Sequence, residues 1–300
     1  MSEPGIPPDL HAWIGREDIE TASLDLQPVR ALAATLDLDQ APNEGDPLPP
    51  GWHWLFLNPL VRRSALDVDG HPRRGGFLPP VDLPRRMWAG GRTAYTAPLT
   101  VGQTATRRSR IIDIRDKSGR SGRLCFVTLE HIWSADDRAC IVEQQNIVYR
   151  EASTRSASAA SSPEAGEPGL TSVPRWCEDF VADSTLLFRY SALTFNAHRI
   201  HYDRDYAREV EGYPELVVHG PLTATLLQGF ATRIEPSRPL SAFEFRGVAP
   251  LFADQPFRLE ADTGSDGSLM LRAVDQDGRT AMEAQVRFGD AVGTVMGTLP

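Results

Sequence analysis

Apolar and polar residues alternate along several stretches of the chain. In residues 123–133 and 139–149 the two kinds broadly alternate, and β-branched and aromatic residues are frequent. Residues 269–275 and 281–288 repeat the pattern. A period of two over such a length is typical of strands that bury one face. Turn-forming residues such as Asp277 and Gly278 separate the stretches, so the pattern predicts long antiparallel hairpins.

Two helices are predicted from a different pattern. Residues 222–234 are apolar around most of a helix circumference, so a helix here must be buried on nearly all sides, for instance by a curved sheet. Residues 28–36 form a shorter helix with Pro28 in its first position. The combination indicates an α+β fold in which antiparallel strands wrap around a long buried helix in the C-terminal half.

Short motifs recur in the same order in the two halves of the chain. Residues 97–103 and 249–255 both contain Ala-Pro-Leu followed by Gln at the same spacing, and each segment precedes an alternating stretch. We infer an internal duplication from this order. Between the halves, residues 151–172 are small, polar and interrupted by Pro and Gly, which predicts a flexible linker. The expected domains are therefore residues 1–150 and 173–300.

The composition is that of a globular protein. With 300 residues, of which 41% are hydrophobic and 24% charged, the chain can bury a sizeable core. No apolar run approaches the length of a membrane-spanning helix, and the first residues lack the pattern of a secretion signal. The three scattered cysteines fit reduced thiols better than a disulfide or metal framework. We therefore expect a cytoplasmic protein that does not associate with membranes.

Charge narrows the range of partners. The net charge of −9 argues against non-specific binding of nucleic acid. Arginine pairs nevertheless gather in the first half, among them Arg85 and Arg86. Such pairs are typical either of solvated surface or of a site for a polyanionic small ligand, and both interpretations stay open.

Proton-transferring side chains are concentrated after residue 190. They comprise Asn196, His198, Arg199, His201 and Asp203. An imidazole beside carboxylate and amide groups can be held as a neutral base, and an amide can hold a water molecule against that base. The segment is therefore a candidate active site.

His219, Gly220 and Pro221 directly precede the predicted buried helix. Backbone amides at a helix start are unpaired, and the helix dipole there favours negative charge. The oxygen of a thioester enolate needs such an environment when a proton is added or removed at the α-carbon. Gly220 lets a substrate approach the backbone closely, and Pro221 suits the first helical turn. We therefore expect a hydro-lyase that acts on an acyl thioester.

Simpler interpretations remain open for some of these residues. His198 also fits an ordinary packed or surface histidine, and Asp203 fits the N-cap of a helix over residues 204–211. His198 and His201 have the spacing of a metal-ligand pair. The chain contains neither Cys-x-x-Cys nor His-Glu-x-x-His, however, so we expect no metal.

The candidate segment resembles the hydratase motif of the MaoC-like hotdog family. In that motif, Asp-x-Asn-Pro-x-His-x-Asp is followed by His-Gly-hydrophobic at the start of the central helix. The chain keeps the Asn, the His and the trailing Asp as Asn196, His201 and Asp203. It departs from the motif in two ways, because Thr194 stands where the family has a catalytic Asp, and two residues are inserted before the His.

The inserted form is similar to one branch of that family. The branch contains mitochondrial type 2 3-hydroxyacyl-thioester dehydratases and bacterial enzymes with a FAS1-like dehydratase N-terminal domain, among them mesaconyl-CoA (3-methylfumaryl-CoA) and itaconyl-CoA hydratases. Residues 84–91, Pro-Arg-Arg-Met-Trp-Ala-Gly-Gly, look like a signature of the same branch. The likeness extends from about residue 10 to residue 290.

The resemblance implies a double hotdog, with two antiparallel sheets each wrapped around a helix, a degenerate N-terminal half and a catalytic C-terminal half. It implies that His201 is the base on water, that Asn196 positions the water, and that Asp203 is a less favoured partner. The thioester carbonyl would bind backbone amides near Gly220. Other residues expected around the substrate are Thr194, Arg199, His219 and Thr223. A free substrate carboxylate is expected to meet Arg199, and the loop with Arg85, Arg86 and Trp88 is the alternative. The remaining arginine pairs are suited to the CoA phosphates.

These expectations lead to a main function and alternatives to it. The main expectation is hydration of mesaconyl-CoA or itaconyl-CoA to citramalyl-CoA, without a cofactor beyond the CoA of the substrate. One alternative is a dehydratase of 3-hydroxyacyl chains on acyl carrier protein or CoA, which would need a deep apolar tunnel. Another is a non-catalytic protein that binds acyl thioesters. A thioesterase is disfavoured because residues 222–234 contain no carboxylate. A homodimer is compatible with the resemblance, and the sequence does not decide the oligomeric state.

Overall fold

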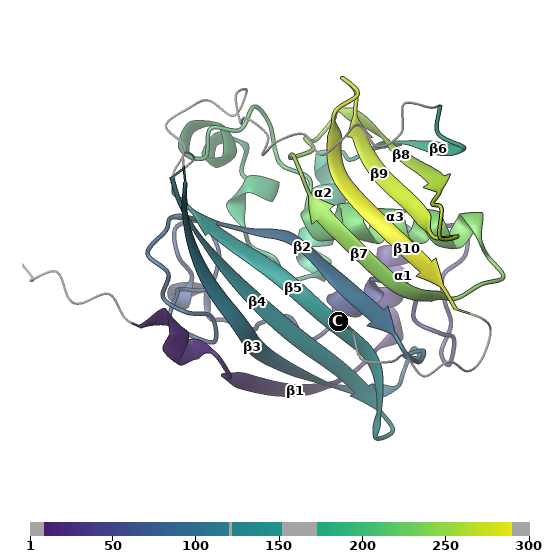
Figure 1. The fold of residues 1–300 in the computed structure, drawn as a ribbon, viewed down its shortest axis with the longest axis horizontal. Helices are drawn as coiled ribbons and strands as arrows, with labels where there is room; N and C mark the ends of the chain where they lie inside the picture. The colour runs from purple at the N-terminus through teal and green to yellow at the C-terminus, as the bar shows by residue number, and fades with distance from the viewer. Residues whose placement is uncertain (1–8, 120–121, 152–172, 290–300) are drawn as a thin grey trace, which may run out of the picture.

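One antiparallel sheet forms the scaffold of the molecule (Figure 1). The computed structural model describes residues 9–119, 122–151 and 173–289. Ten strands follow one another in the order β1-β3-β4-β5-β2-β7-β10-β9-β8-β6. Their bounds are β1 Glu17–Ser23, β2 Arg85–Tyr95, β3 Thr104–Gly119, β4 Gly122–Ala135, β5 Arg138–Arg150, β6 Trp176–Val181, β7 Leu240–Gly247, β8 Pro256–Thr263, β9 Leu269–Asp275 and β10 Thr280–Phe288.

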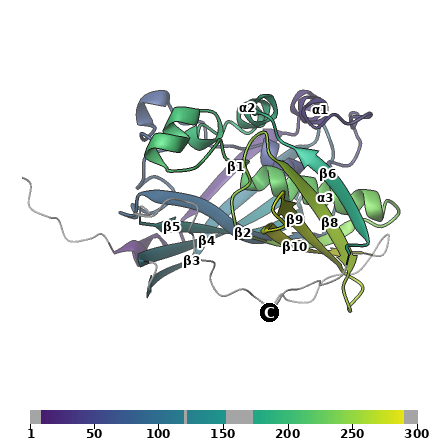
Figure 2. The same cartoon turned by 90° about the horizontal axis from the view of Figure 1, so that it is seen from above.

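The helices lie mainly on one face of this sheet (Figure 2). The α-helices are α1 Leu26–Thr35, α2 Ser184–Leu193 and α3 Gly220–Ile234. Short 3-10 turns are η1 Leu10–Trp13, η2 Trp52–Leu55, η3 Arg63–Ala65 and η5 Arg199–His201, and η6 Tyr206–Val210 is a π-turn. Both predicted helices are confirmed, because residues 28–36 correspond to α1 and residues 222–234 to α3.

The strand order confirms the duplication in the sequence. The first five strands are ordered β1-β3-β4-β5-β2, and the last five mirror them as β6-β8-β9-β10-β7. The alternating stretches at 123–133, 139–149, 269–275 and 281–288 lie in β4, β5, β9 and β10, as predicted. The two halves join where β2 pairs with β7, so the two expected sheets are continuous with each other.

The junction requires two glycines. A Cβ atom on Gly90 would lie 2.5 Å from the carbonyl oxygen of Phe245, and one on Gly91 would lie 2.5 Å from that of Gln144. Real Cβ atoms do not approach backbone oxygen so closely, so β2 passes between its two neighbours only without side chains at these positions. Residues 84–91, the arginine-rich signature, therefore end in Ala-Gly-Gly because β2 packs closely between β5 and β7.

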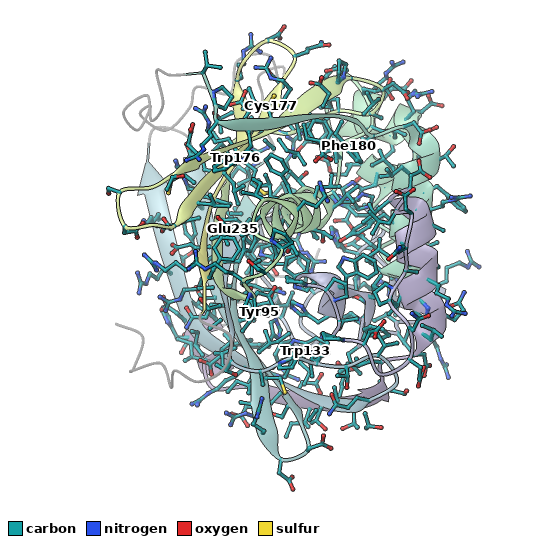
Figure 3. The ribbon with its side chains drawn as sticks, turned by 90° about the vertical axis from the view of Figure 1, so that its right-hand side faces the viewer. Tyr95, Trp133, Trp176, Cys177, Phe180 and Glu235 are labelled. Carbon is teal, nitrogen blue, oxygen red and sulfur yellow. The ribbon has the colours of Figure 1, made fainter. Side chains whose placement is uncertain are left out.

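The long helix α3 is buried against the C-terminal strands β7 to β10, as its apolar circumference predicts. In Figure 3 side chains surround this helix, with Phe180 on one side and Tyr95 on the other. Its buried residues include Leu222, Leu227 and Phe230. Burial of large apolar side chains on all sides of a helix is the main stabilising contribution to such a fold.

The N-terminal sheet has no equally long helix among the described residues. The short turn η2 packs there instead: His53 contacts Trp133 of β4, and Trp54 contacts Trp88 of β2. Residues 56–84 continue as loops with a single 3-10 turn, η3. Because Pro and Gly interrupt this stretch, no helical period can be maintained, and the space that a helix would fill remains open for a cavity.

Some expectations concern regions outside the described residues. Nearly all of the predicted linker, residues 152–172, lies there, and the division into domains at residues 150 and 173 stays a prediction. Within the part that the structure describes, Cys125 and Cys140 are buried thiols and Cys177 is exposed. No helix in this part is long and apolar enough to cross a membrane.

Candidate active site

His201 is buried and has one defined hydrogen bond. Its Nδ1 donates to the carbonyl oxygen of Val217 at 2.8 Å, because a carbonyl oxygen can only accept. No hydrogen bond to Nε2 is found among the described residues. Burial lowers the pKa of His201 to about 4, so the ring is neutral near pH 7 and Nε2 carries a free lone pair. The ring therefore has the state required of a proton acceptor.

The start of α3 lies directly beside this imidazole. The rings of His201 and His219 stack with their centroids 3.7 Å apart. His219 is the N-cap of α3 but its side chain makes no capping bond, and its Nε2 contacts the hydroxyl of Ser191 at 2.8 Å instead. Pro221 has no N–H, so the amide of Gly220 is the first donor of the helix and has no partner among the described groups. An oxyanion can bind at this amide.

Thr223 stands one turn into α3, where its hydroxyl donates to the carbonyl oxygen of His219 at 3.3 Å. The side chain is buried. Its hydroxyl proton is thus used inside the helix.

Asn196 and Thr194 follow the end of α2. The Oδ1 atom of Asn196 accepts from the backbone N–H of His198 at 3.0 Å, which leaves the side-chain NH₂ group available. The hydroxyl of Thr194 donates to the carbonyl oxygen of Tyr190 at 2.7 Å. Threonine thus completes the helix end at this position, and the segment supplies no carboxylate where the family motif has one.

Arg199 and Asp203 bind each other. The Nη2 atom of Arg199 lies 2.7 Å from Oδ2 of Asp203, and its guanidinium also stacks over the ring of Tyr206. The Oδ1 atom of Asp203 accepts from the backbone N–H of Tyr206 at 3.0 Å. This backbone bond, followed by the bond from Arg199, lowers the pKa of Asp203. The helix-capping interpretation of Asp203 matches these contacts, and the cation of Arg199 is already paired.

A cavity of about 940 Å³ lies between the two halves of the molecule. Pro221, Asn196 and Thr194 line it from the C-terminal half. Arg86 and Trp88 of β2 line it from the N-terminal half. Residues far apart in the sequence thus form one site.

The three residues of the arginine-rich signature have different partners. Arg85 forms an ion pair with Glu211 at 3.2 Å. Trp88 donates from Nε1 to the carbonyl oxygen of Gly90 and packs edge-on against Trp54 and Phe245. Arg86 is half-buried at the cavity and has no carboxylate partner among the described residues. Of the two arginines, Arg86 is thus the one that can meet an anionic ligand.

A second polar cluster lines the cavity from the sheet of the N-terminal half. Glu143 is buried, contacts His53 at 3.3 Å, and accepts from Trp54 and Gln145, each at 2.9 Å. Burial acts to raise the pKa of Glu143, but the bond and the charge of His53 outweigh it and lower the pKa to about 2. No pattern in the sequence indicated this cluster, because its members come from η2 and β5.

Four imidazoles form a row that crosses from one half to the other. The row consists of His71, His198, His201 and His219. Ring centroids of His71 and His198 are 4.1 Å apart, and those of His198 and His201 are 5.4 Å apart. We call this group the imidazole row. His71 is the member that lines the cavity, and the other three are not among the lining residues.

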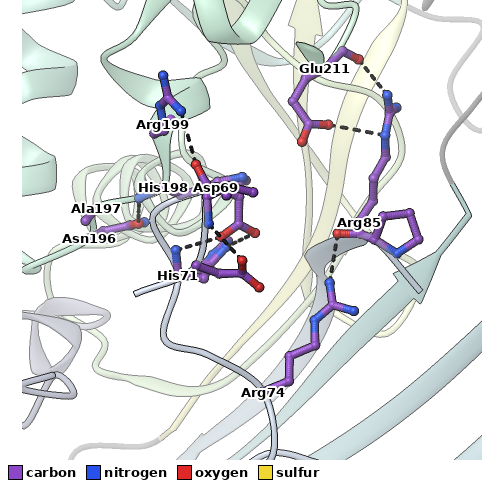
Figure 4. A network of polar contacts seen from close by, with 12 residues as sticks. Asp69, His71, Arg74, Arg85, Asn196, Ala197, His198, Arg199 and Glu211 are labelled. Atoms are coloured by element: carbon purple, nitrogen blue, oxygen red, sulfur yellow. Dashed lines mark hydrogen bonds and ion pairs between the residues drawn. The ribbon is translucent and has the colours of Figure 1, made fainter. Parts of the chain in front are cut away.

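Asp69 stands at the N-terminal end of the imidazole row (Figure 4). Its Oδ2 atom lies 2.9 Å from Nδ1 of His71. Burial acts to raise the pKa of Asp69, but the hydrogen bond and charge of His71 outweigh it, so the pKa is lowered. Neither residue was predicted from the sequence, because both lie outside the hydratase motif. Their signal was a polar Asp-Gly-His-Pro turn, residues 69–72, in a loop-rich region.

Asp69, His71 and His198 are also the described residues that could hold a metal ion, since their ligand atoms lie within 4.8 Å of one another. The set has donors that suit zinc or iron. Asp69 and His71 already satisfy each other by a hydrogen bond, however.

Comparison with known proteins places the chain among dehydratases and hydratases of acyl thioesters. A curated relative from Chloroflexus aurantiacus, named mesaconyl-C(4)-CoA hydratase, is 48% identical over 94% of this chain and 98% of its own length. The mitochondrial hydroxyacyl-thioester dehydratase type 2 of Schizosaccharomyces pombe is 30% identical over 71% of this chain and 77% of its own length.

Solved structures show the same fold at low sequence identity. HtdX of Mycobacterium tuberculosis covers 90% of this chain and 100% of its own, with a TM-score of 0.63 at 18% identity. Another M. tuberculosis protein, described as having a double hotdog fold, covers 91% of this chain and 95% of its own, with a TM-score of 0.55 at 16% identity. The double hotdog is thereby confirmed. The family model for hydroxyacyl-thioester dehydratase type 2 matches residues 51–253, and the chain belongs to that family.

Proposed function

We propose that the protein is a hydro-lyase that hydrates a short dicarboxylyl-CoA ester, with mesaconyl-C(4)-CoA as the favoured substrate and citramalyl-CoA as its product. The observation that carries this proposal is the stacking of neutral His201 on His219, immediately before the unpaired amide of Gly220. The identity of 48% with a mesaconyl-C(4)-CoA hydratase over nearly the whole chain supports the choice of substrate.

The proposed reaction uses these groups in sequence. Asn196 lines the cavity, and its NH₂ group holds a water molecule there. Nε2 of His201, which is not itself among the lining residues, takes a proton from this water, and the resulting hydroxide adds to the β-carbon. Negative charge then develops on the thioester oxygen, which the amide of Gly220 stabilises. The enolate becomes the product when it takes up a proton at the α-carbon, and the release of the proton held by His201 balances this uptake.

The free carboxylate of a dicarboxylyl substrate needs a cation in the cavity. Arg86 is available for this contact, whereas Arg85 and Arg199 are paired with Glu211 and Asp203. A guanidinium binds a carboxylate through two parallel hydrogen bonds, which gives direction as well as charge. Exposed arginines that also line the cavity, Arg63 and Arg73, are suited to the phosphates of CoA.

A longer acyl chain is the second candidate for the substrate. The cavity volume of about 940 Å³ and apolar lining residues such as Phe77, Leu78 and Leu129 favour it. The buried charge of Glu143 on the same wall argues against a long alkyl chain, because apolar groups do not solvate a carboxylate.

We also propose a cytoplasmic location, which rests on the free thiols of the described residues.

The test is a hydration assay that follows the loss of enoyl-thioester absorbance. Mesaconyl-C(4)-CoA, itaconyl-CoA, crotonyl-CoA and a long-chain enoyl-CoA are compared on wild-type protein and on His201→Ala. Because a general base contributes roughly 10²–10⁴-fold, His201→Ala should retain less than about a tenth of the wild-type rate. His11→Ala is a matched control, because His11 is exposed on η1. A higher residual rate in His201→Ala would contradict the assignment, and a wild-type protein without activity on any enoyl-CoA would contradict the function.

A further inference from the structure

Hydration involves two proton transfers, and within the imidazole row His71 is the member that lines the cavity. One proton leaves the water molecule and one arrives at the α-carbon, and two separate groups can carry out these transfers at the same time. Thr194 occupies the place of the family's carboxylate, and its hydroxyl proton is committed to the carbonyl of Tyr190. Asp203 is engaged by Arg199 and by the amide of Tyr206.

We propose that His71, held by Asp69, is this second proton-transfer group, so that a loop of the N-terminal half completes the active site of the C-terminal half. The inference rests on the proposed function. His71 lines the cavity and belongs to the imidazole row that leads to His201. In this assignment His71 is a catalytic residue and Asp69 is a positioning residue.

The geometry of the pair is that of an oriented imidazole. Nδ1 of His71 donates to Oδ2 of Asp69 at 2.9 Å, and the backbone N–H of His71 donates to Oδ1 at 2.8 Å. These two bonds fix both the ring and its tautomer, as a carboxylate does for the histidine of a hydrolase triad. Nε2 has no partner among the described residues, so it is the atom left for the substrate.

The loop that carries His71 is locked onto the catalytic half. The backbone N–H of Arg199 donates to the carbonyl oxygen of Asp69 at 2.9 Å, and Nη1 of Arg199 donates to that of Val68 at 3.1 Å. Gly70 has a φ of +90° and lies so close to Ala197 that a Cβ atom would be 1.7 Å from its carbonyl oxygen. Two of these contacts involve Arg199, which thereby gains a role in holding the loop.

Position and contacts distinguish the two imidazoles. Within the imidazole row, His71 is the member that lines the cavity and binds a carboxylate, and Asp69 opposes the lowering of its pKa by burial and by Arg86. His201 has only a carbonyl partner and stays neutral. In the hydration direction, protonated His71 gives its Nε2 proton to the α-carbon while His201 receives one from water. After the product leaves, His201 returns its proton to solvent and His71 takes one up.

The assignment predicts the sign of the pH dependence. Burial lowers the pKa of His71, Arg86 and Arg74 act in the same direction, and Asp69 opposes them. The nearby ring of His198 is desolvated and neutral, because burial strongly lowers its pKa. Hydration needs His71 protonated and His201 neutral. The value of kcat/KM should therefore fall as pH rises through the pKa of His71, and fall again as pH drops through that of His201, about 4.

The experiment compares His71→Gln and Asp69→Asn with wild type, and uses His11→Gln as the matched control. We expect His71→Gln to lose roughly 10²-fold or more in hydration and to lose the alkaline limb of the pH profile. Asp69→Asn should shift that limb to lower pH, since the carboxylate that favours the proton is gone. A purely structural role of Asp69 would leave the limb in place. Circular dichroism and thermal unfolding verify that the variants fold.

Deuterium incorporation separates the two proposed proton transfers. The 3-hydroxyacyl-CoA product is incubated in D₂O, and mass spectrometry measures exchange at its α-carbon. We expect His201→Ala to keep this exchange and His71→Gln to lose it. If wild type hydrates the substrate while His71→Gln keeps exchange and more than about a tenth of turnover, the assignment of His71 is wrong although the proposed function stands. Loss of wild-type turnover with EDTA would also overturn it, in favour of a metal at Asp69, His71 and His198.

Discussion

At the residue scale, His201 obtains its reactive form from burial and a carbonyl group. Its Nδ1 is fixed by Val217, and the lowered pKa keeps the ring neutral without a carboxylate. The carbonyl of Val217 fixes the tautomer of His201 so that Nε2 is free to accept a proton. In the proposed division of roles, His201 accepts the proton of water, and His71, oriented by Asp69, gives a proton to the α-carbon.

Arg86 is expected to decide between charged and uncharged substrates. Replacing it by Gln removes the cation that faces the substrate carboxylate but keeps a polar side chain. A hydrogen bond to a charged group contributes about 1.5–3 kcal/mol, so kcat/KM for mesaconyl-C(4)-CoA should fall about 10- to 150-fold. The value for crotonyl-CoA, which lacks the carboxylate, should change by less than about threefold. Steady-state kinetics with both substrates measures this ratio.

The control for this prediction is Arg73→Gln. Arg73 is an exposed arginine that lines the same cavity, so its loss should weaken both CoA esters equally. An equal loss on both substrates in Arg86→Gln would show that Arg86 does not contact the carboxylate.

The residues of the family motif could be located from the sequence, but those of the other half could not. Asn196, His201 and Gly220 form one short pattern, and the structure brings them to one site. Asp69 and His71 lie more than a hundred residues earlier in the sequence, in a loop without regular period. Their proximity depends on hydrogen bonds between loops, and no local pattern encodes such a contact.

At the element scale, the loop of residues 67–72 acts as a cover on the segment of residues 196–199. Replacing Gly70 by Ala should displace this loop, because the new Cβ would overlap the carbonyl oxygen of Ala197 and the positive φ would be strained. A displacement of about 1 Å at a reacting group can cost roughly 10²-fold in rate. We expect kcat to fall by that order, and activity assays with thermal unfolding measure the effect.

Gly45→Ala provides the matched control for Gly70→Ala. Gly45 has a φ of +82° but nothing within 4 Å of its Cβ position, so it reports the backbone strain alone. Its activity should stay at the wild-type level. Equal activity of the two variants would mean that the contact with Ala197 does not position the loop.

The hydrophobic period and the turn residues were sufficient to predict β4, β5, β9, β10 and the long helix α3, but not the structure of residues 39–84. The strands β4, β5, β9 and β10 follow their alternation, and α3 follows its apolar circumference. In residues 39–84, Pro and Gly prevent a regular period, and the chain settles by contacts of single side chains such as Trp54 and His53 with the sheet. Such contacts depend on the finished tertiary structure.

At the scale of the whole molecule, a buried hydrogen-bond chain joins the halves beneath their common sheet. The hydroxyl of Tyr95 on β2 accepts from the backbone N–H of Gly51 at 3.0 Å and donates to Oε1 of Gln228 on α3 at 2.5 Å. Gln228 is fully buried. One phenol thus satisfies polar groups from both halves.

Replacing Tyr95 by Phe should destabilise the fold without touching the active site. The change leaves two buried polar groups unsatisfied, which costs about 1–3 kcal/mol in the free energy of unfolding. Chemical denaturation measures the difference. Tyr213→Phe is the control, because the partly buried Tyr213 has no hydrogen bond from its hydroxyl among the described residues, and it should change stability by less than about 0.5 kcal/mol. An equal effect of both variants would contradict the role of Tyr95.

The duplication explains where the cavity lies. In the C-terminal half α3 fills the space against the strands, whereas the N-terminal half has the short turn η2 and loops in the corresponding place. Loss of a long helix from one half opens room for a substrate, and the other half keeps the helix start that binds the oxyanion. The two halves are thus complementary although their strands follow the same plan.

Fusion of the halves at β2 and β7 also determines what the molecule presents to other polypeptides. The central strands β2 and β7 pair with each other, so β1 and β6 are the edge strands of the sheet. Glu17, Asp18 and Glu20 stand along β1. Glu17 and Glu20 pair with Arg108 and Arg107 of β3, and Asp18 is exposed. An incoming strand from a second copy would meet these charged side chains, and charged side chains on an edge strand oppose pairing with another chain.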